Sequence, residues 1–77
     1  MDMVIISTIS DDGTLMEQYL VREKEGIKKF MDILRMHEAV GFNVRGGDIV
    51  KLYEDGRALL EKNGHKLVLY VREREVI

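Results

Sequence analysis

The most regular hydrophobic pattern of the chain lies between Asp48 and Asn63. At about 100° per residue, its apolar side chains and one glycine fall within an arc of about 120°. The members of this arc are Ile49, Leu52, Tyr53, Gly56, Leu59 and Leu60. Asp48 can cap the first turn, and Asn63-Gly64 can supply a left-handed stop. The pattern therefore predicts an amphipathic helix over residues 48–63.

Gly56 lies in the middle of the apolar arc of this predicted helix. A glycine on the packed side allows a helix to approach a strand or another helix closely, and we expect that role here. The alternative is a tolerated glycine, which costs about 1 kcal/mol relative to alanine.

A second helical pattern runs from Lys24 to Val40. Its apolar positions form two adjacent stripes that together cover about half of the circumference, more than one packing partner requires. The first stripe holds Ile27, Phe30, Met31 and Leu34, and the second holds Ile33, Met36 and Val40. Gly41 can end this helix.

The N-terminal segment predicts a β-hairpin. Met3 to Ile9 is β-branched and apolar on both faces, and Asp12-Gly13 is typical of a two-residue type I′ turn. The expected cross-strand pairs are Ser10 with Leu15, Ile9 with Met16, Thr8 with Glu17, Ile6 with Tyr19 and Val4 with Val21. The competing interpretation of the second segment is a helix from Thr14 to Leu20. The alternation after Leu15 favours the strand.

The remaining elements complete an α+β fold. Residues 42–47 read as a loop, and residues 65–72 as a strand with apolar side chains on both faces. With short connections, the order ββααβ makes the last strand parallel to the first. We therefore expect a mixed three-stranded sheet in the order 2-1-3, with two helices packed on one face, as a single small domain over residues 1–77.

Two helices on one face leave the other face of the sheet uncovered. That face is expected to show several apolar side chains and to serve as an interface, with a homodimer or a protein partner covering it. The candidate interface residues are Val4, Ile6, Tyr19, Val21, Val68 and Tyr70. The sheet edges offer a second route, by strand pairing between subunits.

Composition narrows the classes of protein without selecting one. The chain has 77 residues, a net charge of −2 and no cysteine, which excludes disulfides and thiolate metal sites and favours a cytoplasmic location. No apolar run approaches the length of a membrane span, so no membrane partner is expected. The slight acidic excess argues against a broad electrostatic grip on nucleic acid.

No motif indicates catalysis, so we expect a protein that is not an enzyme and has no cofactor or metal. His37 and His65 lack ligands at metal-binding spacing, and they read as a helix residue and a turn residue. The acidic pairs Asp11-Asp12 and Glu54-Asp55 read as turn and helix-surface residues. The serines and threonines of the hairpin have no base at a recognisable spacing.

One loop is a candidate ligand site. Arg45, Gly46 and Gly47 precede the predicted second helix, and Lys51 follows in its first turn. Glycines before a helix free backbone N–H groups for an anion, and the two basic residues add positive charge. Asp48 competes for the same donors, so the alternative is a loop and helix cap.

The predicted order of elements resembles the KH domain of the second type without its first helix, over about residues 3–72. That family binds single-stranded nucleic acid at a Gly-x-x-Gly loop, where this chain has Asn43-Val44-Arg45-Gly46 and lacks the first glycine. The sequence therefore favours a small non-enzymatic interaction module, homodimeric through an exposed sheet face or edge. The alternative is a domain that binds single-stranded RNA through the loop before the second helix.

Overall fold

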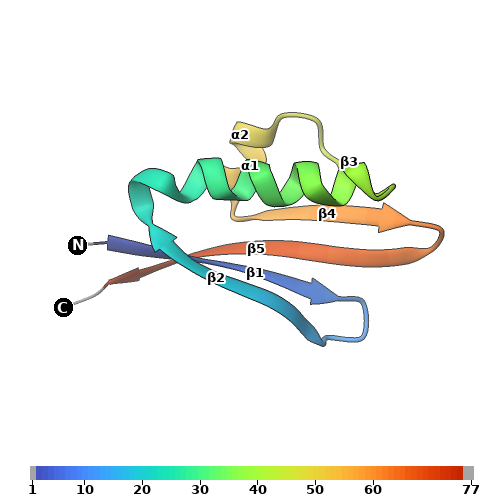
Figure 1. The fold of residues 1–77 in the computed structure, drawn as a ribbon, viewed down its shortest axis with the longest axis horizontal. Coiled ribbons are helices and arrows are strands. Elements are labelled where there is room, and N and C mark those ends of the chain that lie inside the picture. Colours follow the sequence, from blue (N-terminus) through green and yellow to red (C-terminus); the bar gives the residue numbers. More distant parts are fainter. Residues whose placement is uncertain (1, 76–77) are drawn as a thin grey trace.

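The computed structural model describes residues 2–75 as five strands and two helices. They are β1 (Asp2–Ser10), β2 (Leu15–Arg22), α1 (Glu23–Ala39), β3 (Asn43–Arg45), α2 (Ile49–Asp55), β4 (Arg57–Lys62) and β5 (His65–Glu75). The strands form one antiparallel sheet in the order β2-β1-β5-β4-β3, with both helices on the same side (Figure 1). The fold is α+β, but the expected mixed three-stranded sheet in the order 2-1-3 is wrong.

The helix predicted over residues 48–63 is a short helix followed by a strand. α2 ends at Gly56, whose φ of +84° is left-handed and whose N–H donates to the carbonyl groups of Leu52 and Tyr53. From Arg57 onwards the side chains alternate between the two faces of the sheet, with Ala58 and Leu60 buried. Gly56 is therefore the C-cap of α2, and its expected position inside a longer helix is wrong. Its backbone does lie close to a strand, because its carbonyl accepts the Val71 N–H of β5 at 2.8 Å.

Asn63-Gly64 forms the hairpin turn between β4 and β5. Both residues have positive φ, +49° and +82°, and they separate the paired residues Lys62 and His65. This is the backbone that a type I′ turn requires. The additional strand makes β5 antiparallel to β1, so the expected parallel pairing is wrong, and the topological resemblance to KH domains is lost with it.

The first hairpin forms as a hairpin, with a different turn. The pairs Thr8–Glu17, Ile6–Tyr19 and Val4–Val21 are confirmed, but a bulge beside the turn places Ile9 opposite Leu15 instead of Met16. Only Gly13 adopts a positive φ in this turn, so the type I′ prediction is wrong.

The side chain of Asp12 stabilises that turn. Its carboxylate accepts hydrogen bonds from the Ser10 hydroxyl and, at 3.0 Å, from the Thr14 backbone N–H. These hydrogen bonds, the one from Ser10 foremost, lower the pKa of Asp12 from 3.8 to about 2.

α1 follows the prediction closely. It begins directly after β2 and ends before Gly41, whose φ is +102°. The N–H of Gly41 donates to the Glu38 carbonyl and that of Phe42 to the His37 carbonyl, which together form a Schellman motif. Lys62 on β4 donates from Nζ to the Val40 carbonyl at 2.6 Å and so places a positive charge at the helix C-terminus.

The core lies between α1 and one face of the sheet. It comprises Val4, Ile6, Phe30, Ile33, Leu34, Ala58, Leu60 and Leu69. α2 covers one side of this core. The ring of Tyr53 meets that of Phe30 edge to face, with 5.5 Å between the ring centres, and the Tyr53 hydroxyl lies against Gly26. Neither helix in the described part of the chain is long and apolar enough to cross a membrane.

Candidate functional site

The face of the sheet turned away from the helices, called the open face below, is covered by neither α1 nor α2 (Figure 1). Strand register defines its members, because residues opposite one another in paired strands point to the same side. They are Met3, Ile5, Ser7 and Ile9 of β1; Gln18, Leu20 and Arg22 of β2; Lys66, Val68, Tyr70 and Arg72 of β5; Arg57, Leu59 and Glu61 of β4; and Asn43 and Arg45 of β3.

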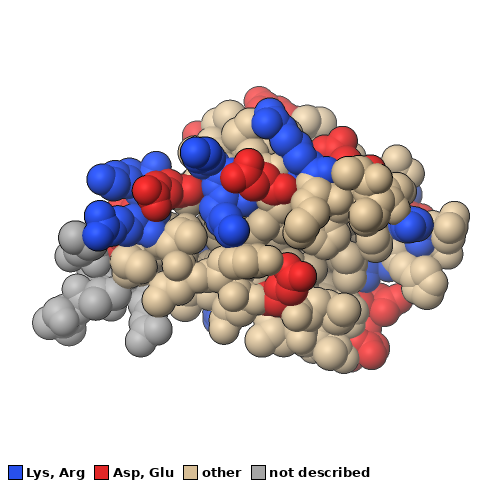
Figure 2. Space-filling model, in the orientation of Figure 1, with Lys and Arg blue, Asp and Glu red and all other residues tan. Residues whose placement is uncertain are grey.

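The open face is basic although the chain as a whole is acidic. Of the 12 basic and 14 acidic residues of the chain, the open-face positions just named hold five basic residues and one acid. The single acid, Glu61, pairs with Arg45 at 2.8 Å. On the helix side, Figure 2 shows basic and acidic side chains interleaved over α1. Positive charge is thus concentrated on the open face.

Tyr70 lies at the centre of the open face, with a hollow on either side. In strand register it stands between Ser7 of β1 and Arg57 of β4, and 36% of its surface is exposed. The smaller hollow, about 270 Å³, is lined by Ser7, Ile9, Tyr70 and Arg72. This hollow therefore brings one side of the Tyr70 ring together with an arginine.

The larger hollow, about 440 Å³, lies where the short strand β3 ends and leaves the first residues of β4 without a neighbour. It is lined by Arg45, Gly46, Leu52, Asp55, Arg57, Leu59, Val68 and Tyr70. Apolar side chains and two arginines face this space, with Asp55 as the only acid among the lining residues. A flat, partly apolar group with a negative neighbour would suit such a lining.

The loop predicted as an anion site is only partly joined to this face. Arg45 and Gly46 line the larger hollow, whereas Gly47 and Lys51 do not. Asp48 caps α2 and accepts the Val50 N–H at 3.0 Å, so it occupies a donor that an anion would need. The loop alone does not form a pocket for an anion, and its participation in ligand binding stays a prediction.

The residues predicted to form an interface fall on both sides of the sheet. Val4 and Ile6 belong to the core, and Tyr19 and Val21 pack against it under α1, so the expectation that these four lie on the uncovered face is wrong. Val68 and Tyr70 lie on the open face. Which surface serves as an interface stays a prediction.

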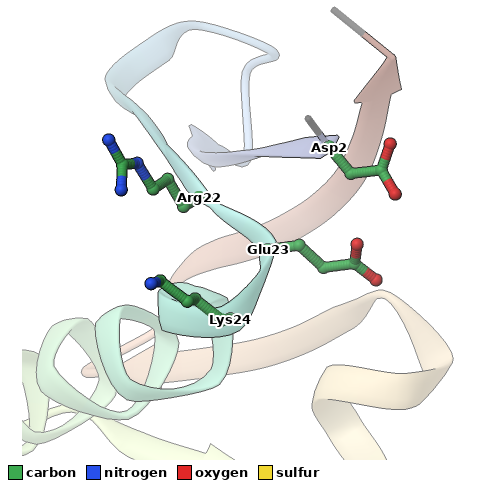
Figure 3. Close-up of a pocket in the computed structure, with 4 residues that line it drawn as sticks. All are labelled: Asp2, Arg22, Glu23 and Lys24. Atoms are coloured by element: carbon green, nitrogen blue, oxygen red, sulfur yellow. The ribbon is translucent and has the colours of Figure 1, made fainter.

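A third hollow lies at the end of the molecule where β1 and α1 begin. It measures about 260 Å³ and is lined by Asp2, Arg22, Glu23 and Lys24. Figure 3 shows that the carboxylates of Asp2 and Glu23 point the same way, while the basic side chains point away from them. A hydrogen bond with Asp2, followed by its charge, raises the pKa of Glu23. Asp2 and Glu23 are both exposed to solvent, as ordinary surface carboxylates are.

The two histidines have structural environments. His37 is partly buried, its Nδ1 lies 2.8 Å from the Ile33 carbonyl, and its ring meets Phe42 edge to face. His65 is exposed beside the turn that precedes β5. Among the described residues, no group of three or more metal-ligating side chains comes together.

Sequence reasoning missed Arg57, Arg72, Arg22 and Lys66 as members of one surface. Arg57 lies within the stretch that was interpreted as one helix over residues 48–63, so it had no expected strand register relative to Tyr70. The Asn63-Gly64 pair, flanked by apolar residues, was the signal that could have revealed the missing strand.

Comparison with protein-family models, curated proteins and solved structures gives no match for this chain. The open face must therefore be interpreted from its own geometry and charge. It is a broad and partly apolar surface with basic residues and a central aromatic ring, which are properties of a binding surface for an extended anionic ligand.

Proposed function

We propose that this protein binds single-stranded nucleic acid across the open face of its sheet. The observation that carries the proposal is the segregation of charge. Five basic residues and one acid occupy this face of a chain whose net charge is −2, and an exposed tyrosine stands at their centre. Single-stranded polynucleotides are bound in this way, with cations for the phosphates and aromatic rings for the bases.

Each part of the face has a distinct role in the proposal. Tyr70 offers its ring to an unpaired base, and the hollows on either side leave room for the stacked base and its neighbour. Arg57 and Arg72 flank the ring along β4 and β5 and meet phosphates or stack on a second base. Lys66 and Arg22 extend the positive surface along and across the sheet.

The charge of the open face also argues against its use as a face-to-face homodimer contact. Two copies stacked through this surface would bring two sets of basic side chains together, and like charges at a contact are unfavourable. A protein partner or a lipid surface would need to be acidic to fit. Single-stranded nucleic acid satisfies both the charge and the exposed ring.

The proposal is tested by fluorescence anisotropy with labelled single-stranded RNA and DNA oligonucleotides of mixed sequence. We expect binding at low salt, with an association constant that falls linearly on logarithmic axes as salt rises. Tyr70→Leu removes the stacking ring and is expected to weaken binding about five- to hundredfold. Arg57→Gln with Arg72→Gln should reduce the salt slope by about 0.7 per lost phosphate contact.

Matched controls separate this face from general electrostatics. Lys28→Gln and Arg35→Gln on α1 each remove one exposed positive charge on the helix side of the molecule. Neither is expected to change the affinity appreciably. Equal losses from Lys28→Gln and Arg57→Gln, absence of binding at the lowest salt, or binding to anionic vesicles without binding to oligonucleotides would each overturn the proposal.

A further inference from the structure

β2 is an exposed edge strand with few of the features that usually protect such an edge (Figure 1). It is eight residues long and contains no proline, glycine or lysine. Its one irregularity, a bulge, is confined to the end beside the turn. The opposite edge, β3, has only three residues. Long unprotected edges pair readily with another strand, whereas short ones do not.

Exposed apolar side chains are concentrated on the same strand. Leu15, Met16 and Leu20 are each more than half exposed, at 52, 58 and 52%. Leu20 points to the open face, because it stands opposite Ile5, and Met16 lies two residues before Gln18 on the same strand, at the bulge beside the turn. These side chains lie along the free edge, where an added strand would cover them.

From these observations we infer that β2 pairs antiparallel with β2 of a second copy of this chain. The pairing has its two-fold axis at Gln18, which stands opposite Gln18 of the other copy. Met16 then faces Leu20, and Glu17 faces Tyr19, in both directions across the axis. The two sheets join into one sheet of ten strands.

This register is self-complementary in chemistry. Each exposed apolar residue meets another apolar residue, and the two glutamines meet side by side. Glu17 already accepts a hydrogen bond from the Tyr19 hydroxyl at 2.6 Å within one copy, and in the pairing it meets a tyrosine again. No two like charges stand opposite one another between Met16 and Leu20.

The neighbouring helix does not oppose the contact by its charge. Where α1 borders β2, the hollow beside Val21 is lined by Glu25, Lys28, Lys29 and Asp32, two acids and two lysines. Lys29 also lies over the ring of Tyr19, with Nζ 4.3 Å from the ring centre. The residues of α1 that border the β2 edge therefore carry equal numbers of positive and negative charges.

A two-fold axis perpendicular to the sheet leaves the open faces of both copies on one side. The inference does not rest on the proposed nucleic-acid function, and the oligomeric state can be measured without any ligand. If both hold, the dimer presents a continuous basic surface twice as wide as that of one copy.

The experiment is sedimentation equilibrium of the full chain, which reports whether the mass is 8.9 kDa or twice that value. Gln18→Lys and Gln18→Glu each place like charges opposite one another on the axis, and we expect each to shift dimer formation at least about tenfold to higher concentration. An equimolar mixture of the two variants should restore a dimer, because lysine then faces glutamate. Met36→Lys on α1, where the native side chain is 50% exposed, is the control and should leave the dimer intact.

Circular dichroism of each variant verifies that the fold is retained. Leu20→Lys provides a second disruption that leaves the hydrogen bond between Gln18 and Ser7 in place. A wild-type chain that stays monomeric at high concentration would overturn the inference. So would a dimer that none of these β2 variants weakens, or two weakened variants whose mixture shows no recovery.

Discussion

Thr8 places a hydroxyl group among the buried residues on the helix side of β1. The residue is 2% exposed, and its Oγ1 has no hydrogen-bond partner among the described residues. A buried hydroxyl without a partner costs about 1–3 kcal/mol relative to an apolar group of the same shape. Thr8→Val should therefore raise the free energy of unfolding by about 1 kcal/mol in urea denaturation.

A control at the surface distinguishes this effect from a general preference for valine in strands. Thr14→Val changes an exposed residue that follows the β1–β2 turn and is expected to alter stability by less than about 0.5 kcal/mol. If Thr8→Val lowers the free energy of unfolding, the Thr8 hydroxyl has a partner in solution that compensates for its burial.

At the scale of elements, the contact between the two helices depends on one glycine. Gly26 on α1 is buried, and a methyl group there would overlap the Tyr53 hydroxyl of α2. Alanine at an open helix position is favoured over glycine by about 1 kcal/mol. Gly26→Ala should instead destabilise the protein by about 1–3 kcal/mol, because the core must adjust to the added atom.

Thermal or urea unfolding shows whether Gly26→Ala lowers or raises the free energy of unfolding, and a decrease is expected. Tyr53→Phe removes the hydroxyl that the methyl group would meet, so Gly26→Ala should cost less in that background. A double-mutant cycle without coupling between the two positions would show that the helices do not meet as described.

The first three elements, β1, β2 and α1, were predictable because each pattern was long or sharply bounded. α1 has 17 residues with a continuous apolar stripe and ends at a glycine, and the first hairpin has alternating strands around a turn. Their pairs were predictable up to the bulge. The bulge itself depends on the local hydrogen bonds of Asp12, which no periodicity reveals.

The prediction failed between residues 42 and 63, where a helical period and a strand period share the same residues. Leu59 and Leu60 fit a helical arc together, yet in β4 they face opposite sides of the sheet. Helical spacing from Ile49 to Tyr53 extended the pattern past Gly56, where the chain already changes direction. A glycine in a short helix and an Asn-Gly pair nearby were better guides to the boundaries than the hydrophobic arc.

The candidate site could not be predicted for the same reason. Membership of the open face depends on strand register, and a shift of one residue moves every side chain to the other face. With β4 read as a helix, Arg57 had no defined relation to Tyr70. Tyr70 was named as an interface residue together with Val68, which shares the open face. The same set also held Val4, Ile6, Tyr19 and Val21, which lie on the helix side.

At the scale of the whole molecule, the two ends of the described chain meet in the middle of the sheet. β1 and β5 are adjacent along their full length, with Asp2 opposite Glu75. β2 and β3 lie at the edges, so the two strands that flank α1 in the sequence are the outermost ones. This arrangement separates the basic open face from the acidic residues that gather where β1, α1 and β5 converge.

Asp2, Glu23 and Glu73 form that acidic corner, and they give the molecule a predictable response to pH. The hydrogen bond with Asp2 is the largest cause of the raised pKa of Glu23, followed by the charge of Asp2, while Glu73 adds a smaller effect. A carboxyl whose pKa is raised on folding binds protons more readily in the folded state. Its contribution therefore favours folding below pH 4.5 and is lost as the pH rises through the raised value.

We expect Asp2→Asn to lower the pKa of Glu23 and to flatten the decrease of stability between pH 4.5 and neutrality. NMR titration of the Glu23 carboxyl measures the first effect, and thermal unfolding across the same range measures the second. Asp11→Asn, in the turn at the far end of β1, removes one carboxylate without touching this corner and should leave the Glu23 titration unchanged. A Glu23 pKa that is the same in Asp2→Asn and in the wild type would mean that the two carboxyls do not interact in solution. The meeting of β1 and α1 at this corner would then have no effect on the pH dependence of stability.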